Sequence, residues 1–270
     1  MSLTLLFHAD ATGPVCNRLA KAGKGLEVAS DKRPLDLSRK TVLRWGSVVA
    51  VNAATQINPV EAVKLARDKR ASRTVLGDLA PATWFTLRDV KTPCVIRPKK
   101  HHAGIEFHVC KTDEEVKRVI TRLTRRGKTW YASELIDKAE EYRVFVLHGR
   151  VVCMSQRFPA NATDVAWNLA LGGRLINAKR DAWRPDVCKA AIVACERLGL
   201  DWGAIDLAVA KNGKVYVFEA NTAPGLRNPY TLGQIAKSLM WAASNGKAPE
   251  IKTGAAKWSH FIHPGLKEKG

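Results

Sequence analysis

Residues 202–221, WGAIDLAVAKNGKVYVFEAN, contain two apolar runs joined by the turn signal KNGK, a pattern that predicts an antiparallel β-hairpin. Side chains two positions apart on a strand lie on one face, so Glu219 and Asn221 share a face. If the two-residue turn lies at Asn212-Gly213, position 206 falls opposite about 219. Asp206 is therefore expected beside Glu219 and Asn221 on the same face of the hairpin.

Three oxygen-bearing side chains at neighbouring positions predict a site for a hard divalent cation. Mg²⁺ takes one or two carboxylates together with substrate phosphates, and Asn221 would add a neutral oxygen ligand. The alternative is that Asp206 and Glu219 form salt bridges with basic residues at a sheet edge. The grouping of all three on one hairpin, with PGL following at 224–226, favours the metal site.

The chain has 270 residues, of which 46% are hydrophobic, enough for one large domain or two to three subdomains. No apolar run approaches the roughly 18–20 residues that cross a bilayer, and the N-terminus, MSLTLLFHAD, lacks the basic start of a secretory signal. We therefore expect a soluble cytoplasmic protein with no membrane partner. The six cysteines form no CxxC pair, and we expect them to be reduced core residues.

The charge balance is strongly basic. Forty-four Lys and Arg against 25 Asp and Glu give a net charge of +19. Such a field attracts polyanions, including nucleic acid, nucleotides and acidic protein tails. The alternative is that the charge, which is spread along the chain, mainly solvates helix faces, and composition alone does not separate the two.

The first quarter of the chain alternates between strand and helix patterns, which predicts a small α/β unit. We expect strands at 3–8 and within 41–52, and a helix at 13–23 that ends at a glycine. A second helix is expected at 58–72, capped by Asn58 with Pro59 at its first position.

Patterns further along the chain predict strands, one more hairpin and three helices. Two strands within 93–110 flank a basic loop, and acidic residues followed by an apolar stripe predict an amphipathic helix at 112–126. The other expected elements are a strand at 129–137, a hairpin at 141–158 turning at His148-Gly149, helices at 186–199 and 229–243, and an irregular C-terminal tail.

The segment LDWGAIDLAVAKNGKVYVFEANTAPGL (200–226) resembles the metal-binding hairpin of ATP-grasp carboxylate–amine ligases, and is most similar to the RimK-type ligases that add glutamate to a ribosomal protein's C-terminus. The resemblance extends in order over roughly 41–228. It covers LARDKRAS (65–72), CVIRP (94–98), SELIDKAEEYRVFVLHGRVV (133–152), SQR (155–157) and WNLALGG (167–173).

This resemblance implies an α/β (α+β) ATP-grasp fold, in which two α+β subdomains grip ATP after a small Rossmann-like N-terminal unit. The expected division is an N-terminal unit at 1–72, a small lid subdomain at 73–132, a C-terminal ATP-grasp core at 133–250 and an irregular tail at 251–270.

The resemblance also implies roles for individual residues. ATP phosphates would meet Lys69, Arg97, Lys99 and Gly104, and the adenine would meet the backbone and side chains of Glu134, Leu135 and Ile136. Glu141 would accept from the ribose hydroxyls. Asp206, Glu219 and Asn221 would hold two Mg²⁺ ions, with Mn²⁺ as an alternative.

At the reaction centre, Arg157 would stabilise the transferred phosphoryl group and Asn168 would assist it, held by the Gly172-Gly173 turn. Each assignment has a structural alternative: solvation for Lys69, a surface acid for Glu141 and a cross-strand salt bridge for Arg157.

Two segments depart from the family pattern or extend it. Where the family has a second lysine and a glycine-rich loop, this chain has RPKKHHAG at 97–104, so an arginine and a stiffer loop take their place. The histidine pair at 101–102 has no third ligand nearby in the sequence, which disfavours a metal site there. LRWGS (43–47) is similar to a substrate-side element of bacteriophage-type ligases, so Arg44 is a candidate for binding an acceptor carboxylate unless Arg44 and Trp45 only pack at a domain seam.

The expected function is an ATP-dependent ligase that joins a carboxylate to an amine through an acylphosphate and releases ADP. No Ser/His/Asp or Cys/His pattern suggests a protein nucleophile, and this chemistry needs none. The acceptor is expected to be an amino acid, an acidic peptide or modified nucleic acid. The alternatives are a nucleotide- or nucleic-acid-binding relic without ligase activity and a kinase-like enzyme that stops at phosphate transfer.

Overall fold

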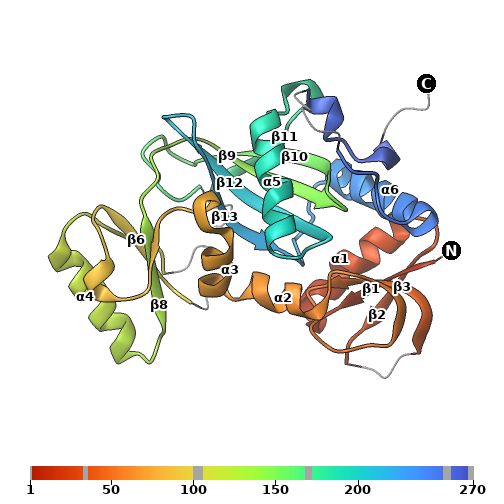
Figure 1. The fold of residues 1–270 in the computed structure, drawn as a ribbon, viewed down its shortest axis with the longest axis horizontal. Helices are drawn as coiled ribbons and strands as arrows, with labels where there is room; N and C mark the ends of the chain where they lie inside the picture. Colours follow the sequence, from red (N-terminus) through yellow and green to blue (C-terminus); the bar gives the residue numbers. More distant parts are fainter. Residues whose placement is uncertain (1, 33–35, 100–105, 168–171, 252–256, 267–270) are drawn as a thin grey trace.

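The computed structural model describes residues 2–32, 36–99, 106–167, 172–251 and 257–266. Within these residues the strands form three sheets, with helices packed against each (Figure 1). The first sheet contains only parallel pairs, whereas the other two are antiparallel. No helix in the described ranges is long and apolar enough to cross a bilayer.

The N-terminal sheet confirms the predicted α/β unit. Its strand order is β2-β1-β3-β4, and helix α1 (Ala9–Ala22) contacts β1 and β2. The strands are β1 (Leu3–Phe7), β2 (Leu26–Ser30), β3 (Leu37–Trp45) and β4 (Ala53–Ile57). Helix α1 begins four residues earlier than the sequence pattern predicted and includes Pro14.

The helix predicted at 58–72 is instead two helices, α2 (Val60–Arg67) and α3 (Lys69–Leu76). Asp68 interrupts them in an extended conformation, and its carboxylate accepts from the backbone N–H groups of Arg70 and Ala71. An aspartate that caps the next helix competes with continuation of the previous one. The break makes Lys69 the first residue of α3.

Asn58 is not the helix cap that the sequence predicted; it ties the N-terminal unit to the large sheet. Its Nδ2 donates to the Trp202 carbonyl at 2.9 Å, and its Oδ1 accepts from the Trp202 N–H at 2.8 Å. The Asn58 N–H donates to the Asp201 carboxylate at 3.1 Å. Its positive φ of 66° is one that asparagine tolerates better than most residues. Next to this contact, Trp45 stacks on Trp202 with ring centroids 5.3 Å apart.

The second sheet, ordered β5-β8-β6-β7, forms a small layer covered by helix α4 (Asp113–Arg125). A capping box between Thr112 and Glu115 begins α4. The helix buries its own Val116, Ile120 and Leu123. The strands are β5 (Thr83–Trp84), β6 (Cys94–Pro98), β7 (His108–Cys110) and β8 (Trp130–Glu134). These elements have a hydrophobic cluster of their own.

The third sheet, ordered β11-β10-β9-β12-β13, contains both predicted hairpins. Helix α5 (Pro185–Arg197) packs against it, and helix α6 (Pro229–Asn245) lies between β10 and the N-terminal unit (Figure 1). The first hairpin turns at His148-Gly149, both with positive φ. The strands are β9 (Lys138–Leu147), β10 (Arg150–Phe158), β11 (Arg174–Asn177), β12 (Trp202–Ala210) and β13 (Val215–Asn221).

The described part of the C-terminal tail is ordered, contrary to the expectation of an irregular segment. It contains two short 3₁₀ helices, η5 (Trp258–His260) and η6 (Pro264–Leu266). Val151 anchors it: its N–H donates to the Phe261 carbonyl at 2.7 Å, and its carbonyl accepts from the His263 N–H at 2.8 Å. The buried Phe261 and Ile262 join the main hydrophobic cluster, which the sequence pattern did not reveal.

All six cysteines are buried and free, as predicted. Burial raises the pKa of the Cys16, Cys94 and Cys188 thiols to about 12. These thiols are therefore neutral near pH 7, as expected of core residues rather than nucleophiles.

Replacing Asn58 with Ala should lower the free energy of unfolding by about 2–4 kcal/mol, because the buried Trp202 backbone groups lose both partners and alanine is strained at positive φ. Urea denaturation measures the change. Asn58→Gly removes the same hydrogen bonds without that strain and should be less destabilised than Asn58→Ala by about 1 kcal/mol. Equal stability of wild type and Asn58→Ala would contradict this role.

His263 should make the fold sensitive to mild acid. Burial, and then the nearby charges of His148 and Arg150, lower the pKa of His263 from 6.5 to about 3. Between these values the unfolded chain binds a proton that the folded chain does not, so stability falls as pH decreases, by at most about 1.4 kcal/mol per pH unit. In His263→Asn the amide oxygen can still accept from the Gly265 N–H, and the difference from wild type should shrink as pH falls. Parallel stability–pH curves for the two proteins would refute the assignment.

Candidate active site

The predicted pairing of Asp206 with Glu219 is confirmed, although a bulge is what produces it. Near the turn, Val209 pairs with Val215 and Leu207 with Val217. The register shifts between Asp206 and Leu207, so one extra residue on β13 brings Glu219 opposite Asp206. Without the bulge, position 206 would face Phe218, and Glu219 would point to the other face.

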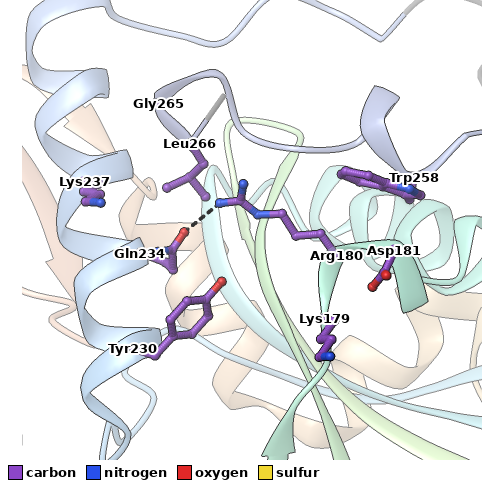
Figure 2. Close-up of a pocket in the computed structure, with 9 residues that line it drawn as sticks. All are labelled: Lys179, Arg180, Asp181, Tyr230, Gln234, Lys237, Trp258, Gly265 and Leu266. Atoms are coloured by element: carbon purple, nitrogen blue, oxygen red, sulfur yellow. Dashed lines mark hydrogen bonds between the residues drawn. The ribbon is translucent and has the colours of Figure 1, made fainter. Parts of the chain in front are cut away.

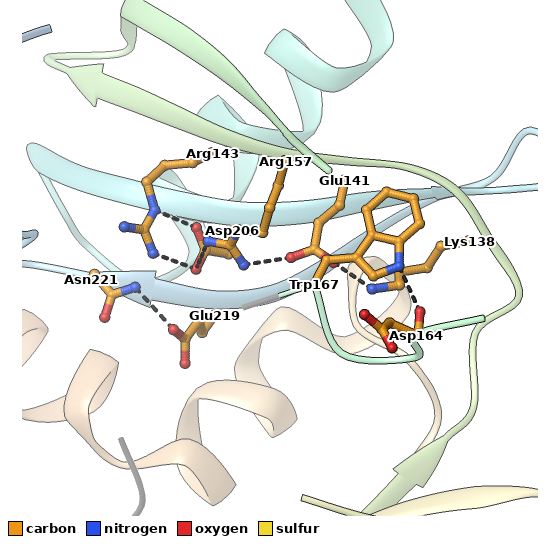
Figure 3. A network of polar contacts seen from close by, with 9 residues as sticks. All are labelled: Lys138, Glu141, Arg143, Arg157, Asp164, Trp167, Asp206, Glu219 and Asn221. Atoms are coloured by element: carbon orange, nitrogen blue, oxygen red, sulfur yellow. Dashed lines mark hydrogen bonds and ion pairs between the residues drawn. The ribbon is translucent and has the colours of Figure 1, made fainter. Parts of the chain in front are cut away.

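Asp206 lies between two guanidinium groups on the face of the sheet shown in Figure 3. Nε and Nη2 of Arg143 donate to its two oxygens at 2.7 Å each, and Nη2 of Arg157 donates to Oδ2 at 3.3 Å. The Asp206 side chain is only 5% exposed. A carboxylate buried to this extent needs such compensation, and the bidentate geometry also fixes its orientation.

Glu141, for which the resemblance implied a ribose contact, extends this network along β9. Its Oε1 accepts from Arg157 Nη1 and its Oε2 from Lys138 Nζ, both at 2.5 Å. Its side chain is 4% exposed and both oxygens are in ion pairs, so Glu141 fixes the position of the Arg157 guanidinium in this structure. Burial lowers the pKa of Lys138, and the Glu141 charge opposes that shift. The Lys138 ammonium also lies 4.5 Å from the centre of the Trp167 ring.

Glu219 is held by Lys69 and Asn221. Lys69 Nζ lies 3.2 Å from Glu219 Oε2, and Asn221 Nδ2 donates to Oε1 at 3.1 Å. Burial alone would raise the pKa of Glu219, but Lys69, the Asn221 hydrogen bond and the more distant Arg97 and Arg143 charges hold it well below the usual range. Glu219 is therefore ionised near neutral pH, as a metal ligand must be.

The donor set fits Mg²⁺ in its chemistry. Two carboxylates and one amide oxygen on adjacent strands are the ligands that Mg²⁺ takes when phosphates complete its shell. Among the described residues no cluster of three His, Cys, Asp or Glu side chains could hold a metal, so the amide of Asn221 would be needed. Both acids also form the salt bridges of the structural alternative, so a metal would share them with Arg143 and Lys69.

Several buried guanidinium groups around Glu219 and Asp206 have donors without a protein partner. In the described chain, Arg73 Nη1, Arg97 Nε and Arg157 Nε are buried and have no hydrogen-bond acceptor. Arg73, on α3, lies over the Phe218 ring at 6.0 Å, and Arg97, on β6, lies over Phe107 at 5.6 Å. Unpaired buried donors are costly, and an anionic ligand with several oxygens would satisfy them.

The predicted contacts of Lys99 with phosphate and of residues 134–135 with adenine involve groups that have partners within the protein. Lys99 forms an ion pair with Asp68 at 2.6 Å, which places it at the start of α3 near Lys69. The N–H groups of Glu134 and Leu135 are bonded to the Ala82 and Pro93 carbonyls at 2.8 and 3.4 Å.

The side chain of Ile136 forms a small, mostly buried apolar cluster with Ala210 and Tyr216, and Phe218 is its more exposed member. An adenine contact would therefore use this cluster and the Ile136 backbone more than the N–H groups of 134 and 135.

Arg44, the candidate for an acceptor carboxylate, is buried within the N-terminal unit. It is 1% exposed, and its guanidinium donates to the Val49 carbonyl at 2.5 Å and to Gln56 Oε1 at 2.6 Å. The seam contact of the alternative is made by Trp45, which stacks on Trp202, whereas the hydrogen bonds of Arg44 stay within the N-terminal unit. Gly104 and Asn168 lie outside the described residues, as do His101 and His102.

Sequence reasoning missed Arg73, Lys138 and Arg143. Arg143 has a readable signal, because it lies two positions from Glu141 on β9 and pairs with Asp206 in the register. Arg73 follows Lys69 by one helical turn, which also places it on the same face.

The three-dimensional arrangement is similar to that of ATP-grasp ligases. The ligase PsnB complexed with minimal precursor is 14% identical with a TM-score of 0.64, and the match covers 89% of this chain and 99% of that chain. The RiPP-associated ATP-grasp ligase of Chryseobacterium gregarium, in complex with ADP and a leader and core peptide, is 16% identical with a TM-score of 0.62, covering 93% and 98%. D-alanine–D-alanine ligase from Bacillus anthracis complexed with ATP is 14% identical with a TM-score of 0.58, covering 83% and 87%.

These similarities establish the ATP-grasp fold that the sequence predicted. No curated protein matches the chain. The model of an ATP-grasp domain family matches residues 78–236, more than half of the sequence. The chain belongs to this ATP-grasp family.

Replacing Asp206 with Asn should lower the free energy of unfolding by about 3–5 kcal/mol in the absence of metal and nucleotide, because Arg143 and Arg157 lose a buried counter-charge. Urea denaturation measures this. In the matched control, Asp137→Asn breaks an exposed pair with Lys211 and should change stability by no more than about 1 kcal/mol. A stabilised Asp206→Asn would show instead that repulsion from Glu219 dominates.

Proposed function

We propose that the protein is an ADP-forming, ATP-dependent carboxylate–amine ligase of the RimK-like type. The observation that carries the proposal is the convergence of Asp206 and Glu219 with a set of cations that outnumber them. These cations are Lys69, Arg73, Arg97, Lys138, Arg143 and Arg157. Family membership and the fold of the ligase structures support ATP as the co-substrate.

In the proposed reaction a carboxylate oxygen attacks the γ-phosphorus of ATP and ADP leaves. An amine then attacks the acyl carbon of the acylphosphate, inorganic phosphate leaves, and the amine nitrogen loses a proton. The protein contributes positioning and charge stabilisation rather than a covalent nucleophile. The reaction therefore needs cations and aligned carboxylates from the protein, and few other catalytic groups.

Each residue has a physical task in this scheme. Lys69, Arg73 and Arg97 would bind phosphate oxygens, and the apolar cluster around Ile136 would accept the adenine. Arg157, oriented by Glu141, would stabilise charge on the transferred phosphoryl group. Asp206, Glu219 and Asn221 would hold two Mg²⁺ ions, or Mn²⁺ in their place, which when bound neutralise phosphate charge.

The proposed acceptor is an acidic peptide, in preference to an amino acid or modified nucleic acid. The structures of similar fold include ligases bound to a precursor peptide and to a leader and core peptide. The net charge of +19 favours an acidic partner.

The proposed division of the chain remains a unit at 1–72, a lid at 73–132 and a core at 133–250.

The second candidate is a nucleotide- or nucleic-acid-binding relic without ligase activity. The observation in its favour is that both Asp206 and Glu219 are ion-paired by side chains of the protein itself. A relic would bind nucleotide or nucleic acid and turn over no ATP in the presence of amines.

Mg²⁺-ATP should raise the melting temperature of the wild-type protein by about 5–10 °C at roughly a hundredfold excess over the dissociation constant. Asp206→Asn/Glu219→Gln should lose the part of this shift that depends on Mg²⁺, whereas the surface variant Asp137→Asn should keep it. The shift is measured by thermal denaturation with ATP alone, Mg²⁺ alone and both together.

Product analysis then separates the remaining possibilities. A ligase sustains ADP release over many turnovers only when a carboxylate and an amine are both present, and its product has the mass of the two substrates less one water. A gain of phosphate would indicate a kinase-like reaction, and an absence of turnover with intact nucleotide binding would indicate a relic. A wild type that ignores Mg²⁺-ATP would overturn the proposed site itself.

A further inference from the structure

A groove of about 760 Å³ lies between helix α6, the segment after β11 and the C-terminal tail (Figure 2). Tyr230, Gln234 and Lys237 line one side from a single face of α6, at i, i+4 and i+7 spacing. Lys179 and Arg180 line the other side, directly after β11. The proposed catalytic machinery uses none of these residues.

The groove is basic and its cations are not neutralised. Lys179, Arg180 and Lys237 form no ion pair among the described residues, and Asp181 is the single acid of the lining. Arg180 reaches across the groove and donates through Nη2 to Gln234 Oε1 at 3.0 Å, an amide that leaves its charge uncompensated (Figure 2). Most cations of the catalytic network, by contrast, lie in ion pairs.

Aromatic side chains and the docked tail complete the walls. Tyr230 is 49% exposed, and its hydroxyl points into the groove, while Trp258 lies on the opposite side (Figure 2). Leu266 closes one side from η6, which is held by the strand-like contacts of Phe261 and His263 with Val151. The groove therefore has a fixed wall, cations on two sides and exposed aromatic surface, which together suit an extended peptide with acidic side chains.

The groove is connected to the reaction centre by a short polar bridge. Thr231, next to Tyr230, donates to Asn177 Oδ1 at 2.9 Å, and Ser155 donates to the same oxygen at 2.9 Å. Ser155 precedes Arg157 by two residues on β10 and so lies on the same face of the sheet. On β11, Leu175 pairs with Arg157, whereas Lys179 follows four residues later at the groove.

We infer that this groove binds an acidic segment of a peptide substrate and directs its reactive end toward Arg157. The inference rests on the proposed ligase function, since it assigns a substrate class and a second contact region to the same site. Phosphate backbones and small anions share the negative charge, but the two aromatic walls and the neutral amide of Gln234 fit side chains and main chain of a peptide better.

The test uses fluorescence anisotropy with a fluorescein-labelled peptide of alternating glutamate and alanine. Lys179→Glu/Lys237→Glu should weaken binding about tenfold or more, since both substitutions reverse charge in the groove. The matched control is Lys117→Glu/Arg118→Glu on the basic face of α4, which changes the net charge of the protein equally. That control should change affinity by about twofold or less at the same ionic strength.

Further arms identify the bound chemistry. A peptide of alternating glutamine and alanine should bind far more weakly than the glutamate peptide, and Tyr230→Ala should weaken the glutamate peptide without changing net charge. An equal loss in the groove and α4 variants would overturn the inference in favour of a general charge effect. Tighter binding of an oligothymidylate probe that the groove variant abolishes would overturn it in favour of nucleic acid.

The failure of this inference is distinguishable from failure of the proposed function. The groove variant should keep the full Mg²⁺-ATP thermal shift, because Lys179 and Lys237 lie outside the nucleotide residues. The Asp206→Asn/Glu219→Gln variant should lose the Mg²⁺-dependent part of that shift and still bind the glutamate peptide. Wild type that responds to Mg²⁺-ATP but does not bind the glutamate peptide would refute the groove and leave the ligase proposal standing.

Discussion

The carboxylate of Asp206 is the charge around which the candidate active site is organised. It sits on a central region of the large sheet, 5% exposed, between the guanidinium groups of Arg143 and Arg157. Glu141 holds Arg157 from the other side, and Lys138 holds Glu141. An unpaired carboxylate at this depth would be strongly destabilising. Each buried charge of the network is therefore compensated by the opposite charge beside it.

The ion-pair network around Asp206 has a net positive charge. Three carboxylates, those of Glu141, Asp206 and Glu219, face six cations, namely Lys69, Arg73, Lys138, Arg143, Arg157 and the more distant Arg97. The local formal charge is thus +3, and buried donors of three arginines have no partner in the described chain. A structural salt-bridge network would be expected to balance. An excess of this size is explained if a polyanion such as a triphosphate supplies the missing charge.

Much of this site could be predicted from the sequence, because local rules control it. The Asn-Gly turn signal and the two-residue period of strands correctly predict a hairpin that carries Asp206, Glu219 and Asn221. The loop is one residue longer than the predicted two-residue turn, because the Ala210 N–H donates to the Lys214 carbonyl, and the bulge restores the predicted pairing. The bulge that brings Glu219 opposite Asp206 is a tertiary feature that no local sequence pattern predicts. The helix break at Asp68 was hidden because no proline or glycine marks it in the sequence. The Asp68 side chain, which accepts from the Arg70 and Ala71 N–H groups, shows that a new helix begins there. The burial of Arg44 was not predictable from the sequence, because it depends on the path of the chain between β3 and β4, which places the Val49 carbonyl and Gln56 beside its guanidinium.

The net charge of +19 does not by itself say where an acidic partner binds. On α4 the cations follow from an amphipathic helix whose apolar stripe covers the second sheet, and solvation accounts for them. In the groove beside α6, cations come from two separate elements and converge on a walled space that also presents aromatic surface. Folding brings the like charges of the groove together from different elements, and their repulsion costs free energy. Cations spread along one solvated helix face carry no such cost. The groove, rather than the more densely charged helix, is therefore where the basic character of this chain needs a ligand to explain it.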